Sequence, residues 1–167
     1  MKMNKNNNRS RIKSTSYFIY ISIRRIMKIN YKRLSIFILI PLVLGGIVGL
    51  LTVPNSNVDS IIPSWIFPVV WTILYILMGV SSYIIYQKIK EVPRIYIIQL
   101  IFNLLWSFIF FKFKLFILAF IWIIILFILV LKMIKEFKEI DPLAGKLQIP
   151  YAIWLVVAAI LNLIQIF

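Results

Sequence analysis

Cysteine and histidine are both absent from this 167-residue chain. Their absence excludes disulfide bonds, thiolate nucleophiles, metal sites built from Cys and His, a proximal histidine for haem, and every catalytic triad whose base is an imidazole. It leaves the redox compartment open. Acidic residues are scarce as well, because five of them stand against nineteen lysines and arginines.

Apolar residues dominate what is present. They make up 62% of the chain, charged residues make up 14%, and the mean hydropathy is +0.98. A soluble domain is about 45–50% apolar and about 25% charged, whereas a membrane-spanning helix needs about 20 apolar residues. The composition therefore excludes an ordinary soluble domain and leaves room for about five membrane spans.

Five apolar blocks follow one another along the chain. Backbone amides in lipid must bond within their own segment, and the blocks lack the short alternation of a barrel, so we expect α-helices. The predicted fold class is an all-α membrane protein, a bundle of five transmembrane helices. Asp141 followed by Pro142 is typical of an N-cap and first helical residue, which predicts the turn into the fifth helix. The helices are expected at residues 34–53, 63–86, 95–111, 115–131 and 147–167.

Residues 1–33 form a basic segment that holds ten of the nineteen lysines and arginines and no acidic residue. Its apolar run, residues 17–23, is too short to span a bilayer. The favoured interpretation is a disordered cytoplasmic extension. The alternatives are a segment that lies on anionic head groups and a translation start at Met27. No signal-peptide cleavage pattern follows the run, so we expect the segment to be retained.

The distribution of lysine and arginine predicts the orientation. With the N-terminus inside, 17 basic residues lie in inner segments and 2, Lys112 and Lys114, lie in an outer loop. Positive residues accumulate on the cytoplasmic side. We therefore expect an integral protein of a bacterial or archaeal cell membrane, with a cytoplasmic N-terminus and an outer C-terminus. The net charge of +14 follows from this topology, so nucleic acid is not among the predicted partners.

Two carboxamides interrupt the apolar pattern of the third helix. Gln99, Asn103 and Trp106 share one face at helical spacing. An unpaired carboxamide against lipid tails costs several kcal/mol, so Gln99 and Asn103 are expected to point into the bundle. They serve as bonds between helices, either alone or together with a ligand contact, and both alternatives remain open.

The second and fifth helices carry similar faces. Pro68, Trp71 and Tyr75 lie on one face of the second helix, and Pro68 is expected to kink it. Pro41 is expected to kink the first helix, where Gly45 and Gly49 permit close approach of another helix, within the bundle or between subunits. The matching face of the fifth helix consists of Tyr151, Trp154, Ala158, Asn162 and Gln165.

Three tryptophans lie far from the interfacial belts where tryptophan is normally found. Trp71 lies roughly 13 Å from one membrane surface at the helical rise, Trp154 lies roughly 12 Å from the other, and Trp106 is equally deep. Indoles beside carboxamides at this depth predict the wall of an internal cavity for a flat aromatic ligand. Trp122 has no polar companions and is expected to pack towards lipid.

All five acidic residues are expected to lie in loops. Coupled transporters and general acid–base catalysis depend on ionisable groups within the membrane. Proton- or cation-coupled transport and acid–base catalysis are therefore both disfavoured.

Residues 63–79 closely resemble the second-helix signature of the TspO/MBR family. These tryptophan-rich sensory proteins are related to the mitochondrial translocator protein, or peripheral benzodiazepine receptor. The resemblance extends in order over about residues 34–167. Its other segments are 99–107 for the third helix, 149–154 and 158–162 for the fifth, and Pro41 with Gly45 and Gly46 for the first.

The resemblance implies a five-helix bundle, usually a homodimer, whose pocket binds porphyrins such as protoporphyrin IX and other hydrophobic aromatic compounds. It implies Trp71 and Trp154 as stacking walls, Gln99 and Asn103 as polar contacts, and Ala158 as a small residue that lets the fifth helix approach. No catalytic residue, metal ligand or cofactor is expected. The candidate ligand-binding residues are Trp71, Trp154, Gln99, Asn103, Tyr75, Pro68, Trp106, Ala158 and Asn162.

The function that the resemblance implies is a membrane receptor or sensor for porphyrins, acting in regulation or stress response, without enzymatic activity. The alternatives are facilitated transport of tetrapyrroles and light-dependent porphyrin breakdown. Three departures from the family matter, and one of them is the basic segment of residues 1–33, which is not part of the family pattern. Residues 54–62 lack the Trp, Tyr and Lys of the family's first loop, and Ile62 replaces the first of two prolines, which leaves the ligand open. The C-terminal cholesterol pattern is missing, so cholesterol handling is not expected.

Overall fold

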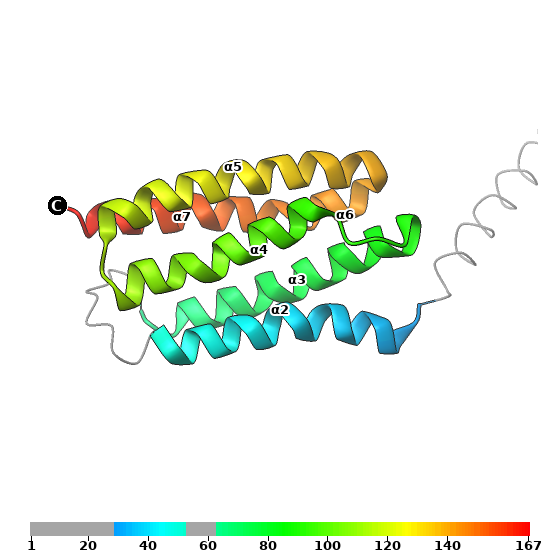
Figure 1. Ribbon diagram of the computed structural model, residues 1–167, viewed down its shortest axis with the longest axis horizontal. Helices are drawn as coiled ribbons and strands as arrows, with labels where there is room; N and C mark the ends of the chain where they lie inside the picture. Colours follow the sequence, from blue (N-terminus) through cyan, green and yellow to red (C-terminus); the bar gives the residue numbers. More distant parts are fainter. Residues whose placement is uncertain (1–28, 53–62) are drawn as a thin grey trace, which may run out of the picture. The chain divides into compact units, whose positions relative to one another are not determined.

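The computed structural model describes residues 29–52 and 63–167, and all regular structure in these residues is helical (Figure 1). The chain divides into two compact units, Met1–Lys32 and Arg33–Phe167. Predictions for the first loop, and nearly all of those for the N-terminal extension, fall outside the described residues. Five segments are long and apolar enough to cross a membrane, which confirms the predicted fold class. They are Tyr31–Thr52, Ile66–Ile89, Arg94–Lys112, Phe116–Ile140 and Pro142–Ile164.

Two of these spans are built from more than one helix. The third consists of α4 followed directly by the π-helix η1, and the fifth consists of the short α6 followed by α7. The elements in chain order are α2 (Tyr31–Thr52), α3 (Ile66–Ile89), α4 (Arg94–Ser107), η1 (Phe108–Lys112), α5 (Phe116–Ile140), α6 (Pro142–Lys146) and α7 (Ile149–Ile164).

The largest difference from the predicted boundaries lies at the end of α5. The helix was expected to end at residue 131, where the apolar run stops, but it continues to Ile140. Lysine and glutamate are good helix formers, so a charged sequence extends the helix beyond its apolar part. Glu136 and Glu139 therefore lie on α5, and the expectation that every acidic residue is in a loop is wrong.

The prediction that Asp141 and Pro142 start a helix is confirmed. The Asp141 carboxylate accepts hydrogen bonds from the backbone amides of Leu143 at 2.8 Å and Ala144 at 3.1 Å, and Pro142 occupies the first helical position. The helix that begins there is α6. The fifth span thus starts five residues earlier than the expected residue 147.

The two prolines within predicted helices behave differently. Pro41 lies inside α2, which continues across it from Tyr31 to Thr52. Pro68 lies in the first turn of α3, because this helix begins at Ile66 and not at residue 63. Amides in a first turn have no partner within the helix, so Pro68 removes no hydrogen bond. Pro68 therefore gives no physical reason for the kink that was expected in this helix.

Two glycines bring α2 and α3 together. A Cβ atom at Gly45 would overlap the ring of Tyr75, and one at Gly79 would lie 2.5 Å from the Cα atom of Ile38. At each of these glycines, the neighbouring helix occupies the space that a side chain would need. Tyr75 lies opposite Gly45 and Gly79 lies opposite Ile38, so residue numbers rise along α3 while they fall along α2. The two helices therefore run antiparallel. Of the two uses expected for Gly45, packing within the bundle is the one found.

Small residues also join α6 to its neighbours. The Ser81 hydroxyl on α3 donates a hydrogen bond to the Ala144 carbonyl on α6 at 2.7 Å. A Cβ atom at Gly145 would lie 2.9 Å from the Ile134 carbonyl oxygen on α5 and would overlap the Lys138 side chain. Because Gly145 has no side chain, α6 packs closely against α5, and the Ser81 hydrogen bond joins it to α3.

The inward face of α5 is a single apolar stripe. Its residues recur at intervals of three and four, as one face of a helix requires. Many large apolar side chains of all five spans remain exposed, as expected for helices that face lipid. The stripe consists of Ala119, Ile123, Leu126, Val130, Met133 and Phe137, all of which are buried.

Replacing Gly45 tests the α2–α3 contact. In Gly45→Ala the new methyl group overlaps the Tyr75 ring, which must move, so we expect the free energy of unfolding to fall by about 1–3 kcal/mol. Thermal unfolding in detergent micelles measures the loss. Gly46→Ala is the matched control, because nothing lies within 4 Å of a Cβ there. Equal destabilisation of the two variants would contradict this packing.

Asp141 follows the last residue of α5, and its carboxylate bonds to α6 and to α3. We expect these bonds to weaken in acid. Besides capping α6, the carboxylate forms an ion pair with Lys88 of α3 at 2.7 Å. Burial alone would raise the pKa of Asp141, but the hydrogen bonds from Lys88 and the two amides, together with the lysine charge, lower it below the ordinary 3.8. The resulting stabilisation is complete above pH 3.8 and is lost as the pH falls through the lower folded-state pKa.

Two substitutions separate the cap from the ion pair. Asp141→Ala removes both, and we expect it to lower the free energy of unfolding by about 1 kcal/mol or more at pH 7. Asp141→Asn retains a good capping residue and should lose less. Both variants should show a shallower loss of stability below pH 4 than the parent protein. If the free energy of unfolding depended on pH in the same way in the variants and the parent protein, the Asp141 carboxylate would not contribute to stability.

Candidate functional site

The nine residues predicted to bind a ligand come from three helices, α3, α4 and α7. Most of them are buried, but Trp71 and Trp154 are only partly buried. Pro68 is exposed, and no ring contact or side-chain bond joins it to the others in the described part of the chain. The buried members of the set are Tyr75, Gln99, Asn103, Trp106, Ala158 and Asn162.

Asn103 stands at the centre of a hydrogen-bonded chain between the three helices. Its Oδ1 atom accepts a hydrogen bond from the Tyr75 hydroxyl of α3 at 2.9 Å, and its Nδ2 atom donates one to the Tyr151 hydroxyl of α7 at 2.9 Å. All three side chains are almost completely buried. The inward orientation predicted for Asn103 is confirmed, and its polar atoms bond helix to helix.

Trp71 packs against the rings around this chain. Its indole lies 5.6 Å from the Tyr75 ring, 6.5 Å from the Trp106 ring and 6.2 Å from the Tyr151 ring, centroid to centroid. These distances are within the range of favourable aromatic pairs. Trp71 and Asn103 therefore share one environment, as their depth in the sequence pattern predicted.

Trp154 joins the same group through two phenylalanines that sequence reasoning missed. Phe67 lies 6.0 Å from Trp154 and 6.2 Å from Phe111, and Phe111 lies 5.9 Å from Trp106, all edge to face. We call the connected rings the aromatic cluster. It consists of Phe67, Trp71, Tyr75, Trp106, Phe110, Phe111, Phe116, Tyr151 and Trp154.

The π-helix η1 explains part of this geometry. Trp106 stacks on Phe110 at 5.0 Å and also meets Phe111, so two adjacent residues of η1 face the same indole. A π-turn contains one more residue than an α-turn and shifts the faces that follow it. Regular helical spacing could have identified Phe67, four residues before Trp71, but it could not have identified the shifted Phe111.

Several polar atoms of the site have no partner among the described residues. Both side-chain polar atoms of Gln99 and of Asn162 are buried without a hydrogen bond, as are the indole nitrogens of Trp106 and Trp154. A buried polar group without a partner costs about 1–3 kcal/mol, and such groups are rare in proteins. The site thus combines one amide, Asn103, whose oxygen and nitrogen are both hydrogen-bonded, with buried donors and acceptors that have no partner among the described residues.

Trp122 corrects an expectation. It was expected to pack towards lipid without polar partners, but its indole nitrogen donates a hydrogen bond to the Phe102 carbonyl of α4 at 2.8 Å. Its ring also stacks on the Phe102 ring at 4.6 Å. Trp122 therefore joins α5 to α4 and is partly buried. In residues 29–52 and 63–167, no group of His, Cys, Asp or Glu is placed so that it could hold a metal ion.

Comparison with known proteins places this arrangement in context. The chain is 34% identical over 102 residues to the tryptophan-rich sensory protein of Cereibacter sphaeroides, a match that covers 60% of this chain and 65% of that protein. It is 30% identical over 130 residues to protein CrtK of Rhodobacter capsulatus, covering 71% and 81% respectively. It is also 31% identical over 106 residues to the tryptophan-rich protein TspO of Chlorobaculum tepidum, covering 60% and 67%.

The family comparison covers most of the chain. A family model described as TspO/MBR family matches residues 37–166, which include every candidate ligand-binding residue. With five apolar helices of spanning length, the match makes this an integral membrane protein. The resemblance inferred from the tryptophan, glutamine and asparagine pattern is confirmed, and the chain belongs to the TspO/MBR family.

Proposed function

We propose that this protein is a membrane receptor that binds a porphyrin, or a similar planar aromatic molecule, between α3, α4 and α7. The observation that carries the proposal is the pairing of clustered indoles with buried polar atoms that lack partners. Ligand sites are mostly apolar and contain a few polar groups that fix the ligand's orientation. Relatives named as sensory proteins support a role in regulation.

The aromatic cluster supplies the apolar part of such a site. Indole and phenol rings bury large areas and favour stacked or edge-to-face partners, which a flat macrocycle also offers. Trp71 and Trp154 are only partly buried, so their rings still have surface available to a ligand. The fully buried Trp106 is better placed to support these walls than to form one.

The polar part is supplied by Gln99, Asn162 and the indole N–H group of Trp154. A porphyrin carries carboxylates and ring nitrogens that can accept or donate hydrogen bonds, and each such bond would satisfy an atom that is now unpaired. Asn103 already bonds to two tyrosines, so it would hold the site's shape and not the ligand.

We also propose the orientation that the charge count favours. Of the nineteen lysines and arginines, seventeen fall on one side of the five spans. Within the described chain, that side includes the end of α5, the end of α3 and the turn into α6. Positive residues concentrate at the cytoplasmic face, so the N-terminus would be cytoplasmic and the C-terminus outside.

Titration with protoporphyrin IX tests the proposed site. We expect saturable binding to the protein in nanodiscs, read from porphyrin absorbance and tryptophan quenching, and an affinity about tenfold weaker in Trp154→Phe, or ~1.4 kcal/mol. Trp122→Phe is the matched control, because Trp122 stacks on Phe102 away from the cluster. Absent saturation, or equal weakening in both variants, would refute the site.

Illumination and flux measurements on the same samples test the function. A receptor should leave bound porphyrin unchanged under light and should not speed porphyrin entry into proteoliposomes. Light-dependent bleaching that requires Trp154 would point to an enzyme instead. Accelerated flux compared with empty vesicles would point to a facilitated transporter.

Substitutions of the two carboxamides of α4 are expected to have opposite effects on stability. Gln99→Leu removes an amide without bonds, so we expect unchanged or raised thermal stability and weaker porphyrin binding. Asn103→Leu leaves two buried phenols without a partner, so we expect a loss of about 1–3 kcal/mol or more in the free energy of unfolding. A stability loss in Gln99→Leu comparable to that in Asn103→Leu would contradict these different roles.

A further inference from the structure

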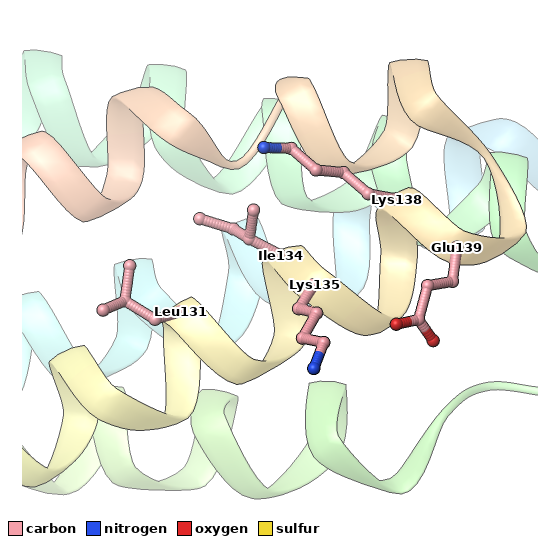
Figure 2. Close-up of a pocket in the computed structure, with 5 residues that line it drawn as sticks. All are labelled: Leu131, Ile134, Lys135, Lys138 and Glu139. Atoms are coloured by element: carbon pink, nitrogen blue, oxygen red, sulfur yellow. The ribbon is translucent and has the colours of Figure 1, made fainter.

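A shallow pocket lies along α5 near the end of that helix, and its lining combines exposed side chains with the buried Ile134. It has a volume of about 390 Å³ and is formed by α5 residues alone (Figure 2). Ile134 and Lys138 extend on one side of the α5 ribbon in this view, and Lys135 and Glu139 extend on the other. The lining residues, which we call the α5 pocket, are Leu131, Ile134, Lys135, Lys138 and Glu139.

The length of α5 places this pocket at the membrane surface. The helix has 25 residues, so at a rise of about 1.5 Å each it is longer than the hydrocarbon core of about 30 Å. Its first sixteen residues, 116–131, are all apolar, and its first charged residue is Lys132. Leu131 and Ile134 therefore lie at the edge of the hydrocarbon, while Lys135 and Lys138 lie at the depth of the lipid head groups.

The two lysines of the pocket are not neutralised by the protein. In residues 29–52 and 63–167, the one ion pair found is that between Lys88 and Asp141. Neither Lys135 nor Lys138 donates a hydrogen bond within this part of the chain, and both are exposed. Lysines near a helix C-terminus also interact favourably with the helix dipole, but that effect explains neither the pocket nor its apolar floor.

We propose that the α5 pocket binds one anionic phospholipid. The phosphate would lie between the side chains of Lys135 and Lys138, which diverge on either side of the pocket, and the start of an acyl chain would lie along the exposed Leu131, beside the buried Ile134. Two lysines and Glu139 give the pocket a net charge of +1, which matches a head group with a single negative charge. The orientation proposed above puts the end of α5 on the cytoplasmic side, where basic pockets of membrane proteins bind anionic head groups. This lipid site is separate from the proposed porphyrin site and does not depend on it.

Native mass spectrometry of the whole protein with phosphatidylglycerol tests the proposal. One lipid should remain bound, and Lys135→Gln with Lys138→Gln should weaken binding about fivefold for each lysine. Lys90→Gln with Lys146→Gln is the matched control, because it removes the same charge from the same end of the molecule outside the pocket. Equal loss in the two double variants would overturn the proposal, since general surface charge would then hold the lipid.

Two further arms separate the lipid from other ligands. Glu139→Gln should strengthen phosphatidylglycerol binding, whereas a pocket for the amine of phosphatidylethanolamine would lose affinity. Inorganic phosphate at the same concentration should not compete, because it lacks the acyl chain that covers Leu131. Preference for phosphatidylethanolamine, or displacement by free phosphate, would overturn the assignment. Thermal unfolding of the Lys135→Gln, Lys138→Gln double variant in zwitterionic detergent checks that it remains folded.

Discussion

The pair of hydrogen bonds at Asn103 is the interaction on which the arrangement of this bundle depends. Inside a membrane, helices gain little from burying apolar surface against one another, because lipid tails are equally apolar. A carboxamide that accepts from Tyr75 of α3 and donates to Tyr151 of α7 sets the facing sides of three helices at once. Trp71 packs on both phenol rings, so the position of this indole follows from the same two bonds.

Close backbone approach is the second constraint. Gly45 lets α2 cover the Tyr75 ring, and Gly145 lets α6 lie against α5, so the helices meet without side chains between them. Around this framework the polar groups divide into two kinds. Asn103 forms hydrogen bonds through both its oxygen and its nitrogen and maintains the structure. Gln99 and Asn162 are buried without partners among the described residues, and these are the groups to which a ligand would bond.

Much of this was predictable from the sequence, and the errors have identifiable causes. The number of spans, the Asp141 cap and the burial of Gln99, Asn103 and Trp106 were all predicted correctly. The end of α5 was misplaced because apolar composition marks the hydrocarbon core and not the end of a helix. Trp122 was assigned to lipid because spacing along one helix cannot show a carbonyl group offered by another.

The sequence by itself determined that the chain crosses the membrane five times and that Gln99, Asn103 and Trp106 turn inward. Both follow from local quantities, since the cost of leaving apolar residues in water or an amide in lipid does not depend on a particular neighbour. Only the tertiary structure decided that Asn103 bonds to two tyrosines while Gln99 bonds to none, and that η1 brings Phe111 to Trp106. Those outcomes depend on distances between helices, and the residue spacing within a single helix contains no information about them.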